Sequence, residues 1–146
     1  MNPYFIKKIK KSLSLILPLL LIVFIFIINK ETPDTRLIDT HVSLTSNEMI
    51  SLLDNEDSKF LDSYIEKAIE IKGVLKEINL KGDTYLLLLA GNKNTKFILC
   101  QMQNDQASKI QNLDLEKEVV IKGIYKGSLT DAILLNCILI DTEVYE

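Results

Sequence analysis

Five short apolar segments follow one another between Ala68 and Thr142, and a short segment with helical spacing separates the third from the fourth. Residues that favour turns, mainly glycine, asparagine, aspartate and serine, lie between the segments. The apolar pattern inside each segment predicts a β-strand. The predicted strands are Ala68–Ile78, Thr84–Ala90, Thr95–Met102, Glu118–Tyr125 and Ala132–Ile140, and the predicted helix is Gln106–Asn112.

This order of elements constrains the fold, because a helix between the third and fourth of five strands is the layout of an OB-fold barrel. Two strands also share a glycine at which their apolar pattern changes phase, Gly73 and Gly123. Glycine at such a point permits the bulge or bend that a barrel strand needs. We therefore expect a mainly β protein built on a five-stranded OB-fold barrel with an inter-strand helix. A generic antiparallel sandwich is the alternative.

A helix is predicted ahead of the barrel. Thr45 and Glu48 have the spacing of a capping box, in which a hydroxyl and a carboxylate satisfy free amides at a helix start. Apolar residues at helical spacing follow, which predicts an amphipathic helix from about Asn47 to Tyr64, either continuous or broken near Asp54. Residues 45–146 are thus expected to form one domain, the helix together with the barrel.

The N-terminal part of the chain has the pattern of a membrane anchor. The run Leu13–Ile28 has no charged residue, and four lysines precede it, Lys7, Lys8, Lys10 and Lys11. As a helix this run is about 24 Å long, slightly less than a typical hydrocarbon core. We predict a basic cytoplasmic N-terminus at residues 1–12 and a transmembrane anchor at residues 13–29, through which the chain contacts the bilayer. A cleaved signal peptide is the alternative, although no A-x-A-like pattern of small residues follows the run.

The predicted anchor also gives the domain a location. Lysines before an apolar run favour a cytoplasmic N-terminus, so the C-terminal domain is expected in the periplasm or the extracellular space. Residues 30–44 contain turn formers and few large apolar side chains, and we interpret them as a linker. His41, the only histidine, lies in this linker.

Charge is distributed unevenly along the chain. The net charge is −3, but after the apolar run 13 of the 17 basic residues stand against all 20 acidic residues, a balance of −7. An acidic domain repels phosphate backbones at long range. The charge therefore counts against general affinity for nucleic acids.

No pattern of catalytic residues is visible. The two cysteines and the single remote histidine cannot close a zinc site, and the histidine's position in a linker gives no support for a Ser-His-Asp arrangement. The glycines are scattered and form no phosphate-binding loop. We expect a non-enzymatic protein with no catalytic residues, metal or cofactor.

The two cysteines, Cys100 and Cys137, fall in the predicted third and fifth strands. These strands are neighbours in an OB-fold, and a disulfide is permitted outside the cytoplasm. A disulfide between the two is one expectation, and a pair of buried free thiols is the other.

OB-folds that bind single strands use aromatic rings and cations on the barrel surface. The candidates of this kind are Tyr85, Lys96, Lys122, Tyr125 and Lys126, together with Phe97, for which a place in the core is the alternative. We predict a ligand face on the second and third strands with the adjoining loops, near Tyr85 and Lys96. The sequence lacks tryptophan and any dense stripe of aromatic and basic residues, so the other interpretation of these side chains is core aromatics and solvated lysines.

Several short motifs carry a family resemblance, namely Tyr64, Ile71–Gly73, Phe97–Cys100, Val120–Gly123 and the stretch from Gly127 through Asp131 to Leu135-Asn-Cys137. On these motifs the chain resembles, over residues 46–140, the tRNA-anticodon-binding-like OB-fold family of small bacterial membrane proteins and lipoproteins. The resemblance implies the barrel expected above and, by analogy, nucleic-acid binding. Fold alone does not establish an activity. We expect a membrane-anchored binding module for a protein or envelope ligand, with single-stranded nucleic acid as the alternative ligand.

Overall fold

The computed structural model describes residues 18, 22, 34–54, 58–91 and 96–140. The chain divides into two compact units, Met1–Thr32 and Pro33–Glu146. In the first unit only Pro18 and Ile22 are described, both in helical conformation, so the predicted anchor at residues 13–29 otherwise lies outside the described residues. Among the residues described, no helix is both long and apolar enough to span a bilayer.

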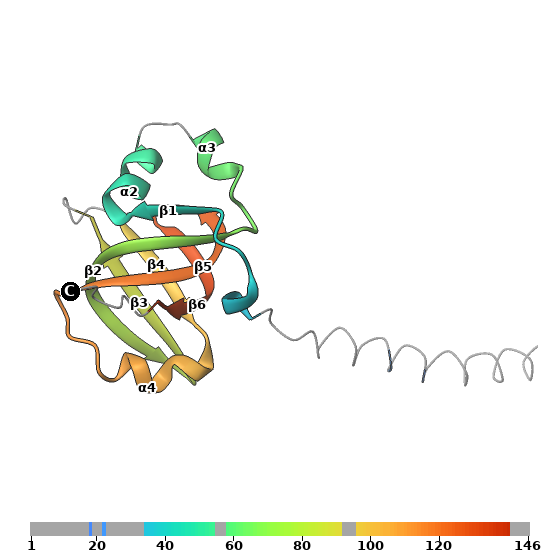
Figure 1. The fold of residues 1–146 in the computed structure, drawn as a ribbon, viewed down its shortest axis with the longest axis vertical. Coiled ribbons are helices and arrows are strands. Elements are labelled where there is room, and N and C mark those ends of the chain that lie inside the picture. Colours follow the sequence, from blue (N-terminus) through green and yellow to red (C-terminus); the bar gives the residue numbers. More distant parts are fainter. Residues whose placement is uncertain (1–17, 19–21, 23–33, 55–57, 92–95, 141–146) are drawn as a thin grey trace, which may run out of the picture. The chain divides into compact units, whose positions relative to one another are not determined.

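The second unit is a closed barrel of five strands (Figure 1). In spatial order they run β2, β3, β4, β6 and β5, and pairing of β2 with β5 closes the barrel. The β4–β6 pair is parallel, whereas the other four barrel pairs are antiparallel. The strand bounds are Ala68–Lys81 for β2, Thr84–Ala90 for β3, Phe97–Met102 for β4, Glu118–Ser128 for β5 and Ala132–Leu139 for β6. This confirms the predicted five-stranded barrel and excludes the sandwich.

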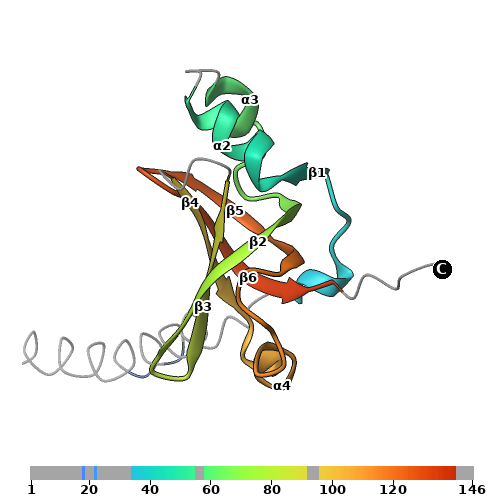
Figure 2. The ribbon, with the colours of Figure 1, turned by 90° about the vertical axis from the view of Figure 1, so that its left-hand side faces the viewer.

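A short helical segment lies between β4 and β5, as predicted. It consists of the 3-10 turn η2 (Asn104–Gln106) and helix α4 (Ala107–Ile110). Figure 2 shows α4 at one end of the barrel and the helices α2 and α3 at the other. Both ends of the barrel are therefore closed by helices.

The predicted amphipathic helix forms two short helices, α2 (Ser46–Asp54) and α3 (Ser58–Asp62), and the residues between them lie outside the described part. The capping box is present, because the Glu48 amide donates to Thr45 Oγ1 at 3.2 Å and the Thr45 amide donates to the Glu48 carboxylate at 2.7 Å. The bond from the Thr45 amide, and after it a bond from the Thr45 hydroxyl to the same carboxylate at 2.9 Å, lower the pKa of Glu48. The start of α2 is thus fixed by its own side chains.

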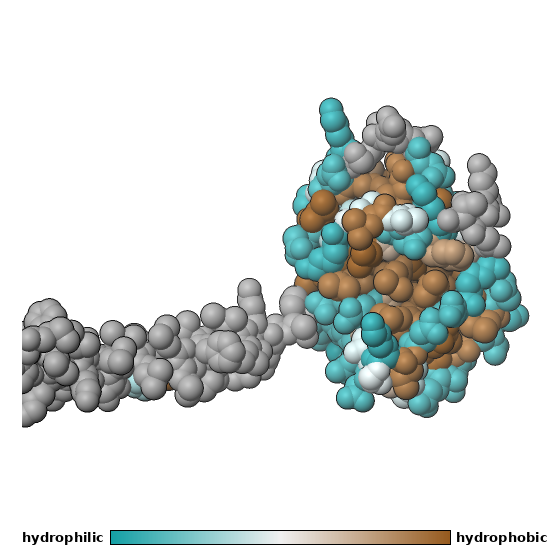
Figure 3. Space-filling model, turned by 180° about the vertical axis from the view of Figure 1, so that it is seen from behind, coloured by the Kyte–Doolittle hydropathy of each residue, from teal (hydrophilic) through white to brown (hydrophobic). Residues whose placement is uncertain are grey.

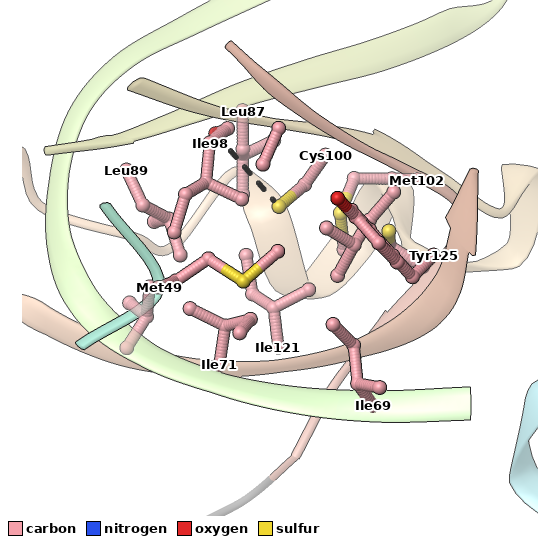
Figure 4. Close-up of a cluster of buried hydrophobic side chains, with 14 of the residues drawn as sticks. Met49, Ile69, Ile71, Leu87, Leu89, Ile98, Cys100, Met102, Ile121 and Tyr125 are labelled. Atoms are coloured by element: carbon pink, nitrogen blue, oxygen red, sulfur yellow. Dashed lines mark hydrogen bonds between the residues drawn. The ribbon is translucent and has the colours of Figure 1, made fainter. Parts of the chain in front are cut away.

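One hydrophobic core fills the barrel (Figure 4). Met49 of α2 points down among the inward side chains of the strands, including Ile71, Ile121 and Leu89, and is fully buried. Leu61 of α3 joins the same core, and so does Ile110 of α4. Burying an apolar side chain of this size stabilises the fold by about 1.5–3 kcal/mol. The helices therefore belong to the folding unit of the barrel.

Gly73 lies where β2 changes partner, since the strand pairs with β5 up to Val74 and with β3 from Val74 onward. A Cβ atom at Gly73 would lie 2.8 Å from Ser46 Cβ, so the glycine also makes room for the start of α2. At Gly123 a Cβ atom would lie 2.4 Å from Cys137 Sγ, and the β5–β6 register shifts between Lys122 and Ile124. Both predicted glycine sites are therefore places of bending and close approach.

The segment before α2 differs from the predicted linker. Residues 34–45, here called the N-terminal strap, contain the 3-10 turn η1 (Thr35–Leu37) and strand β1 (Val42–Thr45), which pairs in parallel with β2. Thr35 is fully buried and its hydroxyl donates to the Asn136 carbonyl at 2.6 Å. A linker at residues 30–44 is therefore wrong for the residues from 34 onward, because their few apolar and hydroxyl groups pack on the barrel.

Candidate binding face

The outer side of β3, β4 and β6 carries a continuous group of large apolar side chains. We call this group the apolar face. It consists of Leu86 and Leu88 on β3, Phe97 and Leu99 on β4, and Ile133 and Leu135 on β6, all of them half-buried. None of the six belongs to the hydrophobic core or packs against it. Figure 3 views the barrel from the side opposite to Figure 1 and shows apolar residues gathered across the middle of that side.

The alternation of each strand fixes which residues point outward. On β3, Leu87 and Leu89 are fully buried and Leu88 is not; on β4, Ile98 and Cys100 are fully buried. Successive strand residues point to opposite faces, so the residues between the buried ones face outward. The pairing then aligns them, because Leu88 is opposite Leu99 and Leu99 is opposite Ile133. The face is a row of cross-strand neighbours, not a set of scattered side chains.

Two leucines outside this face are strongly exposed. Leu80, at the β2–β3 hairpin, has 59% of its surface exposed, and Leu129, in the β5–β6 connection, has 93% exposed. They are single side chains, whereas the apolar face is contiguous. A contiguous apolar face that the chain leaves uncovered is typical of a surface that contacts another molecule.

Five of the cations around the barrel are paired with carboxylates of the same chain. Lys96 pairs with Asp54 at 2.7 Å, and Lys126 pairs with Glu66 at 2.7 Å. Three more basic residues in the described part are paired in the same way, Arg36 with Asp34 and Asp105, Lys72 with Glu118, and Lys76 with Glu116. Binding to phosphates requires cations that replace the counterions of the nucleic acid. Each of these five must leave a carboxylate before it can do so.

The structure does not bring the five residues predicted for the ligand face together. Tyr125 is 1% exposed and lies in the core, where burial raises the pKa of its hydroxyl. Lys122 is 8% exposed, and its ammonium group donates to the Ile38 carbonyl of the strap. Tyr85 is half-buried and packs against the core. Lys96 and Lys126 are in ion pairs. The predicted strands carry the candidate face, but of the candidate aromatic and basic residues only Phe97 belongs to it.

The sequence contained a signal for this face. The four consecutive leucines from Leu86 to Leu89 leave β3 without a polar side. A strand that is apolar on both sides is expected to be covered on both sides. In this structure one side of β3 packs on the core and the other lies on the uncovered apolar face.

Cys100 and Cys137 are free thiols in this structure, and both are fully buried. Burial raises the pKa of the Cys137 thiol well above its usual range, and a hydrogen bond with the Cys100 thiol raises it further. The two residues are therefore close neighbours, and the predicted disulfide stays a prediction. In the described residues no group of three or more histidine, cysteine, aspartate or glutamate side chains is placed to hold a metal ion.

Comparison with known proteins gives a family and a fold. The family model described as tRNA_anti-like matches residues 1–139. A solved structure of a candidate nucleic acid-binding lipoprotein from Klebsiella pneumoniae is similar with a TM-score of 0.57 at 14% identity, covering 76% of this chain and 100% of that one. At this identity the likeness shows the fold alone. No curated protein matches the chain.

Two further solved structures are similar at lower scores. A candidate aspartyl-tRNA synthetase from Leishmania major has a TM-score of 0.48 at 11% identity, covering 66% of this chain and 20% of that one. The OBody AM3L09, bound to hen egg-white lysozyme, has a TM-score of 0.43 at 11% identity, covering 53% of this chain and 85% of that one.

Proposed function

We propose that this chain, which belongs to the tRNA_anti-like family, is a non-enzymatic binding module that takes an apolar segment of a protein partner on its apolar face. OB-folds use the surface of their second and third strands and the adjoining loops for ligands. In this barrel those strands are β3 and β4, and their outer side is the apolar face. The single observation that carries the proposal is that this side is apolar, uncovered and continuous.

The chemistry of the surroundings supports a polypeptide as the occupant. Protein interfaces have an apolar centre and a polar rim. Leu88 lies opposite Glu77 of β2, and Leu86 lies between Asn79 and Gln101, so polar residues flank the leucines. The acidic balance of the domain favours a partner segment that is neutral or basic outside its apolar contact.

We also propose that the domain works outside the cytoplasm on an anchor at residues 13–29. The uncharged run and the lysines before it support this location. A similar fold in a protein described as a lipoprotein is consistent with an OB domain held at a membrane. Digestion of the domain by protease added to intact cells, or to spheroplasts if an outer membrane shields it, is the expected result. Protection that ends only on lysis would contradict the location.

The ligand class can be tested by peptide selection on the full chain in lipid nanodiscs. The selected peptides are expected to be rich in leucine, isoleucine and phenylalanine. Leu88→Asp is expected to weaken their binding at least about 30-fold, the effect of losing a central interface residue. The matched control is Leu115→Asp, which changes an exposed leucine away from the face and is expected to leave binding unchanged. Equal losses in the two variants would contradict the assignment of the face.

Binding of single-stranded nucleic acid is the second candidate function. It is favoured by the family description and by the lipoprotein described as a candidate nucleic acid binder. It predicts binding of a twenty-nucleotide oligomer at micromolar concentration or better, weakening steeply with salt. Lys96→Ala and Tyr85→Ala would then reduce binding, whereas Leu88→Asp would reduce only peptide binding. Salt-sensitive oligomer binding without any peptide selection would replace the first proposal.

A further inference from the structure

Cys100 and Cys137 lie on neighbouring strands of the barrel, directly beneath the apolar face. Cys100 is on β4 next to Leu99, and Cys137 is on β6, the parallel neighbour of β4. The register of this pair shifts between Cys100 and Met102, and Met102 is opposite Cys137. Both cysteines are fully buried in the same hydrophobic core, and the Cys100 thiol donates a weak hydrogen bond to the Ile98 carbonyl at 4.0 Å. The proteins that keep a disulfide are mainly those outside the cytoplasm.

The barrel leaves space for the Cys137 sulfur in particular. A Cβ atom at Gly123 would lie 2.4 Å from Cys137 Sγ, which is far inside van der Waals contact. On the same strand as Cys137, Asn136 has φ of +53°, and its carbonyl accepts the Thr35 hydroxyl at 2.6 Å. Glycine on one side and a left-handed residue on the other thus hold Cys137 in a defined place.

We propose that Cys100 and Cys137 are a disulfide site that is oxidised while the barrel folds and that then locks the parallel β4–β6 seam. In this step each thiol gives up one proton and one electron, and one S–S bond forms. A disulfide of a small molecule or of an oxidoreductase takes up the two electrons and two protons and becomes two thiols. The inference rests on the location outside the cytoplasm in the proposed function, and not on the apolar face.

The timing follows from burial. No oxidant reaches a fully buried thiol in the closed barrel, and a thiol with a raised pKa has little of the reactive thiolate. The bond must therefore form before the seam is covered. The two cysteines are 37 positions apart in the chain, 137 − 100. In the chain-entropy model, closing a loop of this size favours folding by roughly a thousandfold in the equilibrium constant.

The first test counts thiols in the full chain taken directly from its membrane. Cells are lysed in urea with an alkylating reagent, and the intact mass is measured with and without prior reduction. We expect no alkylated cysteine without reduction and two after it. Two alkylated cysteines without reduction, in cells where external protease digests the domain, would overturn the disulfide and leave the location standing.

A second test applies if the protease experiment shows that the domain lies in the cytoplasm. That result would refute the proposed location outside the cytoplasm. The full chain, denatured and reduced, is refolded in nanodiscs with a glutathione redox buffer. We expect the Cys100–Cys137 bond to form during refolding and to shift the unfolding equilibrium at least a hundredfold relative to the Cys100→Ala/Cys137→Ala variant. The chain that is first folded in the reduced form is expected to stay reduced in the same buffer. Failure of the bond to form in refolding, or equally rapid oxidation of the folded reduced chain, would overturn the proposal.

Discussion

The outer surface of the barrel has two sides that differ in what covers them. On the side of β5, Ile124 is 6% exposed and Lys122 is 8% exposed, because the N-terminal strap lies over this region. On the side of β3, β4 and the first half of β6, residues of the same apolar character are only half-buried. The chain thus covers one apolar side with its own residues and leaves the other open. This difference is the physical basis for assigning the open side to a partner.

We expect the open side of the barrel to tolerate a charged side chain and the covered side not to tolerate one. This is the largest effect on stability that we predict. Ile124→Asp places a carboxylate under the strap without a partner and should lower stability by about 3–5 kcal/mol. Leu99→Asp leaves its carboxylate in water and should change stability by about 1 kcal/mol or less. Thermal unfolding of the full chain in nanodiscs, followed by circular dichroism, should then show Tm lowered by at least about 10 °C for the first variant. Similar Tm values would mean that the two sides do not differ in cover.

For peptide affinity we expect the opposite order, with the larger loss from substitutions on the open side. Leu99→Asp and Leu88→Asp should each weaken a selected apolar peptide by about 2 kcal/mol or more, because both lie in the centre of the face. A strap-side substitution, Ser43→Asn, should leave the peptide affinity unchanged, since Ser43 is exposed on β1 and the asparagine amide can still donate to Glu70. Titration of a labelled peptide at two salt concentrations measures both effects. Loss of affinity in Ser43→Asn but not in Leu99→Asp would move the site to the strap side.

The contact between the N-terminal strap and the barrel depends on one hydrogen bond of Thr35. Thr35→Val keeps the shape of the side chain but removes the donor to the Asn136 carbonyl, and should lower stability by about 1–2 kcal/mol. Thr130→Val, at an exposed position, should change stability by less than about 0.5 kcal/mol. Hydrogen exchange of the strap amides should also rise in the first variant alone. Unchanged exchange would show that Thr35 does not hold the strap in place.

The smallest effect concerns the helix that follows the strap. The hydrogen bonds from Thr45 lower the pKa of Glu48 in the folded state. A group with a lowered folded pKa stabilises the fold above its unfolded pKa of about 4.3 and loses this contribution as pH falls through the folded pKa. The Tm of Glu48→Ala should therefore lie below that of the unchanged chain at pH 7, and the gap should narrow below about pH 4. A gap that stays constant down to pH 3 would contradict the role of the ionised carboxylate.

The barrel and its inter-strand helix could be predicted from the sequence because strand alternation and turn residues are local signals. The same holds for the capping box, in which Thr45 and Glu48 are three residues apart. The strap could not be predicted in this way. Its strand has only four residues, and the burial of Thr35 depends on Asn136, which is 101 positions away.

The ligand face predicted from the sequence and the apolar face lie on the same two strands but differ in their side chains. Register shifts in β5 between Lys122 and Ile124 and between Tyr125 and Gly127 interrupt its pairing with β6. A slip of one residue reverses the side to which a strand residue points, so the inward position of Tyr125 could not be fixed from the sequence. The run Leu86–Leu89 has no polar residue to mark its outer side. Only the pairing with β4 separates the core leucines from those of the face.

The central claim is that the open side contacts a polypeptide, and photocrosslinking in intact cells tests it most directly. A photoreactive residue replaces Leu99 in the full chain, and a matched variant carries it at Ser43 on the covered side. We predict that position 99 gives an adduct, and that protease digests the attached partner whereas nuclease does not. The adduct should disappear when Leu88→Asp is added to the same chain. Position 43 should give no adduct. An adduct sensitive to nuclease, or equal adducts from the two positions, would contradict the account.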